Sequence, residues 1–313
     1  MNKVKVIYMS GGADYTILPL KALYLSKKIS LQSIYTKAAL PSGRGKKVKD
    51  TPILEYVKKM QLPYMCPKNF KSNEEIKFIK KLNPDIILVY SYGLILPKSI
   101  IEVAKYGCIN IHPSLLPKWR GPSPIQYSLL NNEKKTGFCI MEMNEKVDTG
   151  DIFFKKTIDI KKEDNTYTLL NRISLKVSLI IEKLLLDIIQ NKIIKNKQEH
   201  SVATYSYKIE KKDTVINFKE EALKVYGKIK AYAPHPGARF FRNNEMIKVF
   251  DAEVVNNCKN YDKVGIILDN NLLISCHKGA IRLLKIQREG KKILPAKEVL
   301  NGWKLDLGTK INE

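Results

Sequence analysis

Short apolar segments alternate with amphipathic ones through the first half of the chain. Apolar runs rich in β-branched and aromatic residues predict strands at residues 4–9, 31–36, 85–90, 108–111 and 137–143. The run at 85–90 is apolar almost throughout, as in a strand that is buried on both faces of a parallel sheet. Strands that alternate with helical segments predict a doubly wound α/β domain with a mostly parallel sheet.

Helical periodicity and capping residues occupy the intervals between these strands. Residues 17–28 repeat apolar side chains at helical spacing. Thr51 before Pro52 predicts a helix start, and Ser72, with an acidic residue three positions later, predicts another. Residues 167–189 predict one long amphipathic helix that closes the domain.

The pattern changes in the last third of the chain. Short β-like runs separated by Asn-rich or Gly-containing turns lie at residues 246–250, 263–268, 272–275 and 281–286. This spacing predicts a small antiparallel domain, an OB-like β-barrel or a sandwich. The stretch 191–198 is polar, basic and without periodicity, which is typical of a linker. We therefore expect one domain over residues 1–190, a linker over 191–206 and a β-barrel domain over 207–313.

The charge of the chain favours a polyanionic partner. Its 313 residues include 55 Lys and Arg against 31 Asp and Glu, a net charge of +24, which exceeds what solubility requires. However, 48 of the 55 cations are Lys, and a compositional bias alone could produce part of this excess. The densest local cluster has four cations in six residues beside glycines: Arg44, Lys46, Lys47 and Lys49. A solvated charged face is the alternative interpretation of that cluster.

Cysteine and histidine spacing gives no sign of a metal site. The five cysteines form no C-x-x-C pair and no two of the four histidines have ligand spacing, so we expect no metal. Cys108 and Cys139 lie inside apolar runs and are predicted to be buried. No apolar run approaches the roughly 18 residues of a membrane span, and the first eight residues do not resemble a signal peptide. We expect a cytoplasmic protein.

One proline-rich stretch carries the first candidate site. Residues 110–124 read NIHPSLLPKWRGPSP and directly follow a predicted strand. The prolines exclude a helix or a central strand there, and ligands of open α/β sheets bind beyond the carboxyl ends of strands. A rigid loop that begins with Asn110 and His112 is therefore a candidate site. The alternative is a structural loop in which Asn110 caps a turn and the imidazole of His112 is half buried.

A second polar loop supports the catalytic interpretation. Residues 142–151 (EMNEKVDTGD) follow another predicted strand, and Asp148 can approach His112 from there. A carboxylate beside an imidazole fixes its tautomer and favours its protonated form, which suits acid–base chemistry. The alternative is that Asp148 only caps a turn with Thr149 and Gly150.

Together these segments resemble the folate-dependent formyltransferases. The matching residues are Asn110 to Pro117, then Arg120-Gly121, then Asp148-Thr149-Gly150. Further segments are similar to the members that formylate methionine on initiator tRNA: SYGLILP at 91–97, PSGRGKK at 41–47, APHPGA at 233–238 and NGW at 301–303. Residues 10–16 (SGGADYT) and 233–236 depart from the usual family pattern.

The resemblance implies the substrates and the residues that serve them. It implies 10-formyltetrahydrofolate as formyl donor, initiator Met-tRNA as acceptor, a monomer, and no metal. Its implied catalytic residues are Asn110, His112 and Asp148. The folate would lie along Ser114, Leu115, Leu116 and Pro117, with its pterin near Tyr92, Gly93, Ile95 and Leu96. The tRNA would contact Arg44, Lys46, Lys47 and Lys49.

Two other functions are compatible with the same residues. One is a formyltransferase acting on a small amine, such as a glycinamide ribonucleotide or an amino-sugar nucleotide. The basic cluster at 44–49 and the separate basic C-terminal part argue against it, because small substrates require neither. The other is an RNA-binding protein without catalytic activity, against which the joint presence of Asn110, His112 and Asp148 argues.

Overall fold

Contacts within the chain divide it into two compact units. The structure is a computed structural model that describes residues 3–42, 47–303 and 305–311. The first unit contains Met1–Pro122, Gly137–Ile158 and Leu170–Tyr205. The second contains Ser123–Thr136, Asp159–Leu169 and Ser206–Glu313. The chain therefore contributes two internal segments to the second unit before its C-terminal part.

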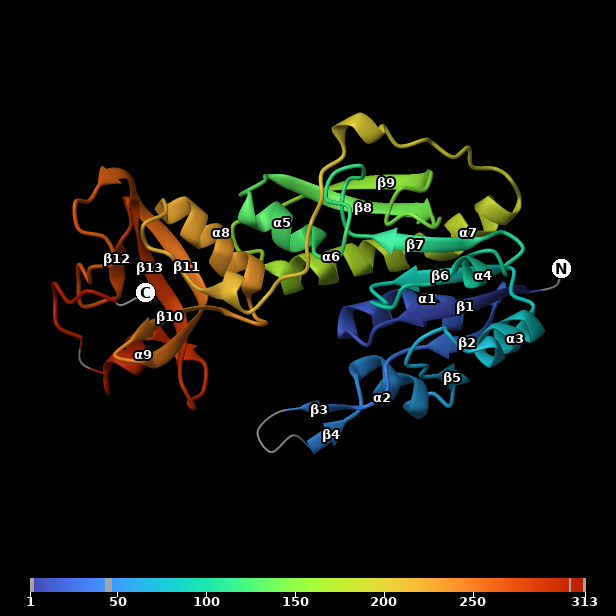
Figure 1. The fold of residues 1–313 in the computed structure, drawn as a ribbon, viewed down its shortest axis with the longest axis horizontal. Coiled ribbons are helices and arrows are strands. Elements are labelled where there is room, and N and C mark those ends of the chain that lie inside the picture. Colours follow the sequence, from blue (N-terminus) through green and yellow to red (C-terminus); the bar gives the residue numbers. More distant parts are fainter. Residues whose placement is uncertain (1–2, 43–46, 304, 312–313) are drawn as a thin grey trace. The chain divides into compact units, whose positions relative to one another are not determined.

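The first unit is built on a mostly parallel sheet (Figure 1). Within the described residues its order is β5-β2-β1-β6-β7-β8-β9. Neighbours from β5 to β7 run parallel, and β7 and β8 run antiparallel. The doubly wound fold predicted from the sequence is confirmed. The strands are β1 (Val4–Ser10), β2 (Ile29–Tyr35), β5 (Tyr64–Met65), β6 (Ile86–Tyr90), β7 (Cys108–His112), β8 (Lys135–Glu142) and β9 (Ile152–Asp159).

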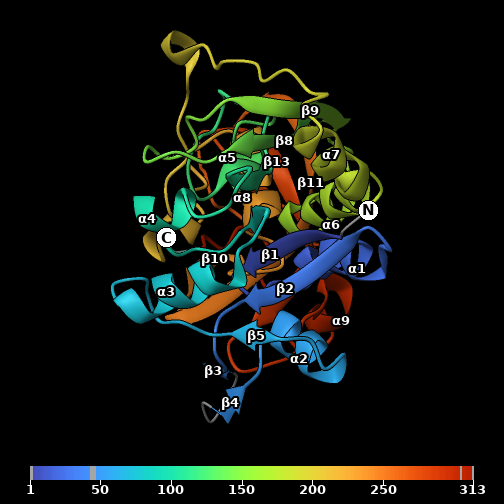
Figure 2. The ribbon, with the colours of Figure 1, turned by 90° about the vertical axis from the view of Figure 1, so that its right-hand side faces the viewer.

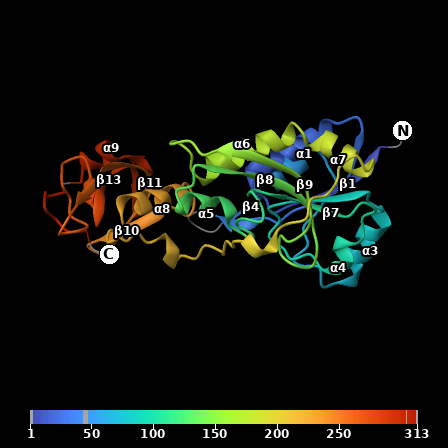
Figure 3. The same cartoon turned by 90° about the horizontal axis from the view of Figure 1, so that it is seen from above.

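Helices cover both faces of this sheet. Figures 2 and 3 show α1 and α7 on one face and α3 and α4 on the other. The predicted caps are present, since Thr51 accepts a hydrogen bond from the Leu54 amide and Ser72 from the Glu74 amide. The helices are α1 (Ile17–Leu25), α2 (Pro52–Lys59), α3 (Asn73–Leu82), α4 (Lys98–Ile101), α6 (Thr166–Ser178) and α7 (Ile181–Ile189), with short 3-10 turns at Asp14–Thr16 and His200–Val202.

Two elements of this part differ from the sequence-based prediction. The single helix expected over 167–189 is wrong, because the chain forms α6 and α7 with a break between them. The Ser178 hydroxyl donates a 2.8 Å hydrogen bond to the Leu175 carbonyl and so competes with the helical bonding pattern. Between β2 and α2 the chain also forms a short antiparallel pair that was not predicted, β3 (Leu40–Ser42) and β4 (Lys47–Lys49).

The second unit contains the predicted antiparallel β-domain. Its strands pair in the order β10-β11-β13-β12, with β14 on β13. The strand expected over 263–268 is wrong, since only isolated bridges form at Ile266 and Ile267. Helix α8 was not predicted and packs against β11, β13 and α5. The elements are α5 (Pro124–Leu130), a 3-10 turn (Lys212–Thr214), α8 (Ala222–Tyr232), β10 (Ala238–Arg242), β11 (Glu245–Asn260), β12 (Leu273–Ser275), β13 (Lys278–Arg288), β14 (Leu294–Pro295) and α9 (Ala296–Leu300).

The cysteines on the central strands are structural. Cys108 and Cys139 are fully buried, as predicted, and burial raises the pKa of the Cys139 thiol to about 11. A thiol in that state is not a ready nucleophile. None of the helices in the described part of the chain combines the length and apolar character that a membrane span requires.

Candidate active site

The candidate site begins where β7 ends. Asn110 and His112 are two residues apart on this strand, so their side chains leave the same face of the sheet. Because β6 and β7 are parallel neighbours, the segments that follow both strands start from the same edge. Ligands of doubly wound sheets bind at such an edge. The N-x-H spacing therefore places an amide and an imidazole side by side at the expected place.

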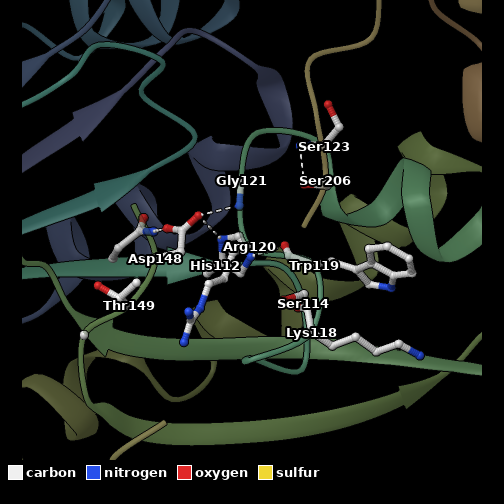
Figure 4. Close-up of polar contacts among 12 residues, drawn as sticks. His112, Ser114, Lys118, Trp119, Arg120, Gly121, Ser123, Asp148, Thr149 and Ser206 are labelled. Atoms are coloured by element: carbon white, nitrogen blue, oxygen red, sulfur yellow. Dashed lines mark hydrogen bonds and ion pairs between the residues drawn. The ribbon is translucent and has the colours of Figure 1, made fainter. Parts of the chain in front are cut away.

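Asp148 joins these two side chains from the loop between β8 and β9 (Figure 4). Its Oδ1 accepts a long 3.4 Å hydrogen bond from Asn110 Nδ2, and its Oδ2 lies 3.6 Å from His112 Nδ1. The same Oδ2 accepts a 2.8 Å hydrogen bond from the amide of Gly121. The structure thus brings Asn110, His112 and Asp148 into one cluster, as the sequence predicted, and adds a backbone donor.

The other side of the His112 ring faces the backbone of the proline-rich loop. Nε2 lies 3.0 Å from the carbonyl oxygen of Trp119. Trp119 has a φ of 60°, a conformation that is strained for a bulky residue and persists only where neighbours impose it. His112 is 3% exposed, and both ring nitrogens face oxygen acceptors. A protonated imidazole can donate on both sides, whereas a neutral one can donate on only one.

Gln198 connects the two loops of the site and was not predicted as a functional residue. Its Oε1 accepts hydrogen bonds from Arg120 Nε and Nη2 at 3.1 and 2.8 Å. Its Nε2 donates to the carbonyls of Asp148 and Gly150 at 3.0 and 2.7 Å. Arg120 also donates to Nδ1 of His200 at 2.8 Å. Gln198 is 6% exposed, so its amide fixes the Asp148 loop against a buried guanidinium.

The segment expected as a linker lies against the first unit. Asn196 and Ile152 exchange two backbone hydrogen bonds of 2.9 and 3.0 Å. Thr204 accepts a hydrogen bond from the Trp119 amide through its hydroxyl and one from the Arg120 amide through its carbonyl, both 2.9 Å long. This stretch therefore supports the strained turn that faces His112. Its polar composition resembles that of a linker because its partners lie far away in sequence.

The residues expected along the folate are divided between core and surface. Ser114 and Leu116 are fully buried, and Leu116 packs with Cys139, Met141 and Ile152. The Ser114 hydroxyl donates a 2.6 Å hydrogen bond to the Lys118 carbonyl and closes the turn of the loop. Leu115 and Pro117 are partly exposed. Because Ser114 and Leu116 are buried, the groups of this loop that can contact a ligand are its backbone and the partly exposed Leu115 and Pro117.

The segment after β6 shows the same division. Tyr92 and Leu96 belong to the hydrophobic core, where Tyr92 packs against Phe70 with ring centroids 6.1 Å apart. Gly93 is exposed with a φ of 75°, and Ile95 is 93% exposed. An exposed isoleucine beside a polar strand end is an apolar surface available to a ligand.

The unusual turn after β1 is integrated with this segment. The Gly11 amide donates to the Ser91 carbonyl at 3.0 Å, and a Cβ on Gly11 would lie 2.6 Å from the carbonyl oxygens of Ser91 and Tyr92. The Tyr15 hydroxyl donates to Ser91 Oγ at 3.1 Å. The turn at residues 10–16 therefore holds the ends of β1 and β6 close together, and these are the two strands at which the winding direction of the sheet reverses.

The predicted tRNA contacts fall mainly where the structure gives no side-chain description. Arg44 and Lys46 lie outside the described residues, and only the backbone of Lys47 is described. Lys49 is exposed on β4. Among the described residues, no group of three His, Cys, Asp or Glu side chains has the geometry of a metal site.

Comparison with known proteins identifies the family. Residues 3–184 match the Formyl transferase model, and residues 208–304 match the model of the formyl transferase C-terminal domain. A methionyl-tRNA formyltransferase of Francisella tularensis subsp. novicida (strain U112) is 37% identical over 310 residues, which covers 98% of this chain and 97% of the relative. The chain belongs to the methionyl-tRNA formyltransferase family. A relative from Francisella tularensis subsp. holarctica (strain LVS) matches with the same identity and coverage.

Solved structures of formyltransferases share the fold at lower identity. A methionyl-tRNA formyltransferase from Clostridium thermocellum gives a TM-score of 0.58 at 21% identity, covering 80% of this chain and 93% of that one. WlaRD, a sugar 3N-formyltransferase, gives 0.65 at 19% identity, covering 93% and 100%. HypX from Aquifex aeolicus in complex with tetrahydrofolic acid gives 0.62 at 16% identity, covering 99% of this chain and 51% of HypX. These likenesses concern the fold, and family membership rests on the sequence relatives.

Proposed function

We propose that this protein transfers the formyl group of 10-formyltetrahydrofolate to the methionyl amino group of initiator Met-tRNA. The observation that carries the proposal is the cluster of Asn110, His112 and Asp148 at one sheet edge, in a chain aligned over nearly its full length with methionyl-tRNA formyltransferases. The product, N-formylmethionyl-tRNA, serves translation initiation, and the reaction takes place in the cytoplasm.

The three clustered side chains supply what an acyl transfer to an amine requires. The attacking ammonium must lose a proton, negative charge develops on the formyl oxygen, and the leaving nitrogen must gain a proton. The Asn110 amide and protonated His112 are hydrogen-bond donors for the developing charge. Asp148 stabilises the protonated ring and holds its orientation through the contact at 3.6 Å. The ammonium loses two protons on becoming the formamide N–H, of which one goes to the leaving nitrogen and one is released to solvent. The new C–N bond forms as the bond from the formyl carbon to N10 breaks, so the carbon keeps its oxidation state.

The edge next to this cluster fits a folate. Its polar groups are backbone amides and carbonyls in loops fixed by proline and by the buried Leu116, which cost little entropy to hold in place. Exposed Gly93 and Ile95 offer, respectively, an open backbone and an apolar side chain for a flat ring. In the proposal, Ser114, Leu115, Leu116 and Pro117 line the folate, and Tyr92, Gly93, Ile95 and Leu96 approach its pterin through this segment.

The acceptor is bound by the basic parts of the chain. Arg44, Lys46, Lys47 and Lys49 contact the tRNA, and residues 207–313 form the tRNA-binding domain that accompanies the catalytic domain at 1–190. The net charge of +24 supports this assignment, because phosphate contacts dominate the affinity of proteins for RNA. The protein acts as a monomer in this proposal.

Formylation assays test the proposal directly. The protein is incubated with 10-formyltetrahydrofolate and initiator Met-tRNA, and in parallel with a free amino-sugar nucleotide and with glycinamide ribonucleotide. We expect formyl-Met-tRNA as the only product. Formylation of a small amine in place of the tRNA would overturn the assigned acceptor. Tight tRNA binding without any formylation would overturn the proposed activity and indicate an RNA-binding protein without catalytic activity.

A further inference from the structure

A cavity with charged side chains in its wall lies entirely within the second unit. It has a volume of about 400 Å³ and lies beside the start of β10, the adjoining part of β11 and the turn before the 3-10 helix at Lys212–Thr214. Three cationic side chains line it: Lys211, Arg239 and Lys248. The volume falls within the range of roughly 300–1,000 Å³ that is typical of small-ligand sites.

Arg239 is the unusual member of this group. It is 9% exposed, and one Nη donates to the Lys211 carbonyl. Its Nε is buried and has no hydrogen-bond partner within the part of the chain that the structure describes. Among the described residues, the other Nη has the sulfur of Met246 at 3.9 Å as its sole hydrogen-bond partner. Within the described residues, no carboxylate lies in ion-pair range of Arg239. A buried guanidinium without a counter-ion is costly, and an anion in the cavity would remove that cost.

The strand pairing adds a second cation directly opposite the first. Arg239 on β10 pairs with Lys248 on β11, so the two like charges face each other across the strands. Such a pair destabilises a sheet unless an anion lies between the charges. Gly237 keeps the space open, because a Cβ there would lie 3.3 Å from Cδ of Lys248 and 3.1 Å from the Phe250 ring.

The acidic residue at the cavity does not neutralise these charges. Glu210 lines the same cavity, but its carboxylate forms a 2.9 Å ion pair with Lys212. Pro236 and Ile209 add apolar wall on which a ribose can pack. Three cations, one of them a buried guanidinium without a counter-ion among the described residues, lie beside apolar wall in a cavity larger than a lone ion. Such a site fits a phosphodiester with its sugar.

We propose that this cavity binds a backbone phosphate of the tRNA. The identification of the occupant as RNA rests on the proposed function, whereas the presence of a phosphate site rests on the cavity alone. The cavity thereby gives the second unit one defined contact with the acceptor, separate from the cluster at residues 44–49.

The first arm of the test uses inorganic phosphate and the full chain without folate or RNA. Thermal unfolding is followed as phosphate replaces chloride at constant ionic strength, for the wild type, for Lys211→Gln/Lys248→Gln, and for the control Lys278→Gln/Lys297→Gln. We expect phosphate to raise Tm for the wild type and the control, and the cavity variant to bind phosphate about tenfold more weakly. In phosphate-free buffer the cavity variant should melt at a higher temperature than the wild type, because it lacks the opposed charges.

The second arm measures binding of uncharged initiator tRNA to the same three proteins over a range of salt. We expect the cavity variant to lower the affinity severalfold more than the control, and to lower the slope of log affinity against log salt by about 0.7–0.9 for each lost phosphate contact. Equal phosphate stabilisation in the wild type and the cavity variant would mean an adventitious ion only and would overturn the site. A phosphate effect that depends on the cavity, combined with unchanged tRNA binding, would overturn the RNA assignment and leave a site for a free phosphate compound. Failure of the proposed function would appear separately, as absent formylation by the wild type.

Discussion

At the scale of single residues, Asp148 is the centre of the candidate site. One carboxylate contacts the Asn110 amide, the His112 ring and the Gly121 backbone. It adopts a φ of 52°, which Asp tolerates better than most residues. The spacing of Asn110 and His112, together with the Asp148-Thr149-Gly150 segment, predicted from the sequence that these side chains lie close together. The Gly121 amide that donates to Asp148 and the Gln198 side chain that holds the Asp148 loop come from distant segments. No local sequence pattern predicts these contacts.

Replacement of Asp148 by Asn should abolish most of the catalysis. Asn keeps the size of the side chain but has no charge to stabilise the protonated ring of His112, so we expect kcat to fall by about 10²-fold or more. The KM values for both substrates should change little. Steady-state kinetics with 10-formyltetrahydrofolate and Met-tRNA measure the effect. Asp151→Asn, three residues further along the same loop, is the matched control and should retain wild-type kcat. Near-normal turnover in Asp148→Asn would refute the assignment.

Gln198→Met should show that the 196–206 segment acts on catalysis through the Asp148 loop. The substitution removes two hydrogen bonds from Arg120 and two to the Asp148 and Gly150 carbonyls. We expect a loss of about 2 kcal/mol in the free energy of unfolding and a roughly tenfold lower kcat, with a smaller change in KM for tRNA. Chemical denaturation and kinetics measure the two effects, with Gln190→Met on the surface as control. A stability loss with unchanged kcat would reduce Gln198 to a purely structural role.

At the scale of elements, the prediction succeeded where a segment decides its own structure. The central strands and the capped helices were read correctly, because buried parallel strands are apolar throughout and capping is local. Helix α8 was missed because Gly227 in its middle disfavours a helix by about 1 kcal/mol. Packing requires a glycine at this position, since a Cβ on Gly227 would lie 2.7 Å from the Leu129 carbonyl oxygen of α5. The break between α6 and α7 depends likewise on bonding that the apolar periodicity does not reveal.

The close approach of β1 and β6 gives a prediction at this scale. In Gly11→Ala the new Cβ would lie 2.6 Å from the Ser91 and Tyr92 carbonyl oxygens, and backbone cannot yield as a flexible side chain does. We expect lower stability and a severalfold higher KM for 10-formyltetrahydrofolate, because the segment that carries Gly93 and Ile95 is displaced. In Gly302→Ala the new Cβ meets no atom of the described residues within 4 Å, so this variant serves as control. An unchanged KM for 10-formyltetrahydrofolate in a folded Gly11→Ala protein would mean that this edge of the sheet does not contribute to folate binding.

At the scale of the whole molecule, the net charge of +24 has two explanations: the overall composition of the chain, and cations placed where they bind the tRNA. The excess of Lys over Arg, 48 against 7, shows that composition contributes to the +24. Ion pairs of exposed lysines with neighbouring acids, such as Lys195 with Glu142 at 2.8 Å, use part of the positive charge. If cations at particular positions bind the tRNA, neutralising them must weaken tRNA binding more than neutralising the same number elsewhere. A pair of variants that lose equal charge tests this.

Neutralisation of the basic cluster at residues 44–49 provides that comparison. A variant with Gln at Arg44, Lys46, Lys47 and Lys49 loses four charges, as does a control with Gln at the exposed lysines 71, 77, 80 and 81 on and before α3. If the cluster contacts the tRNA, its loss should raise KM for Met-tRNA by at least tenfold and lower the slope of log affinity against log salt by about 0.7–0.9 per contact. The control should change both quantities only slightly, since its charges act from a distance and are screened beyond about 10 Å at 0.1 M salt. Neither variant should alter KM for 10-formyltetrahydrofolate. Equal losses in the two variants would mean that the tRNA responds to total charge and that the cluster at 44–49 has no special place in recognition.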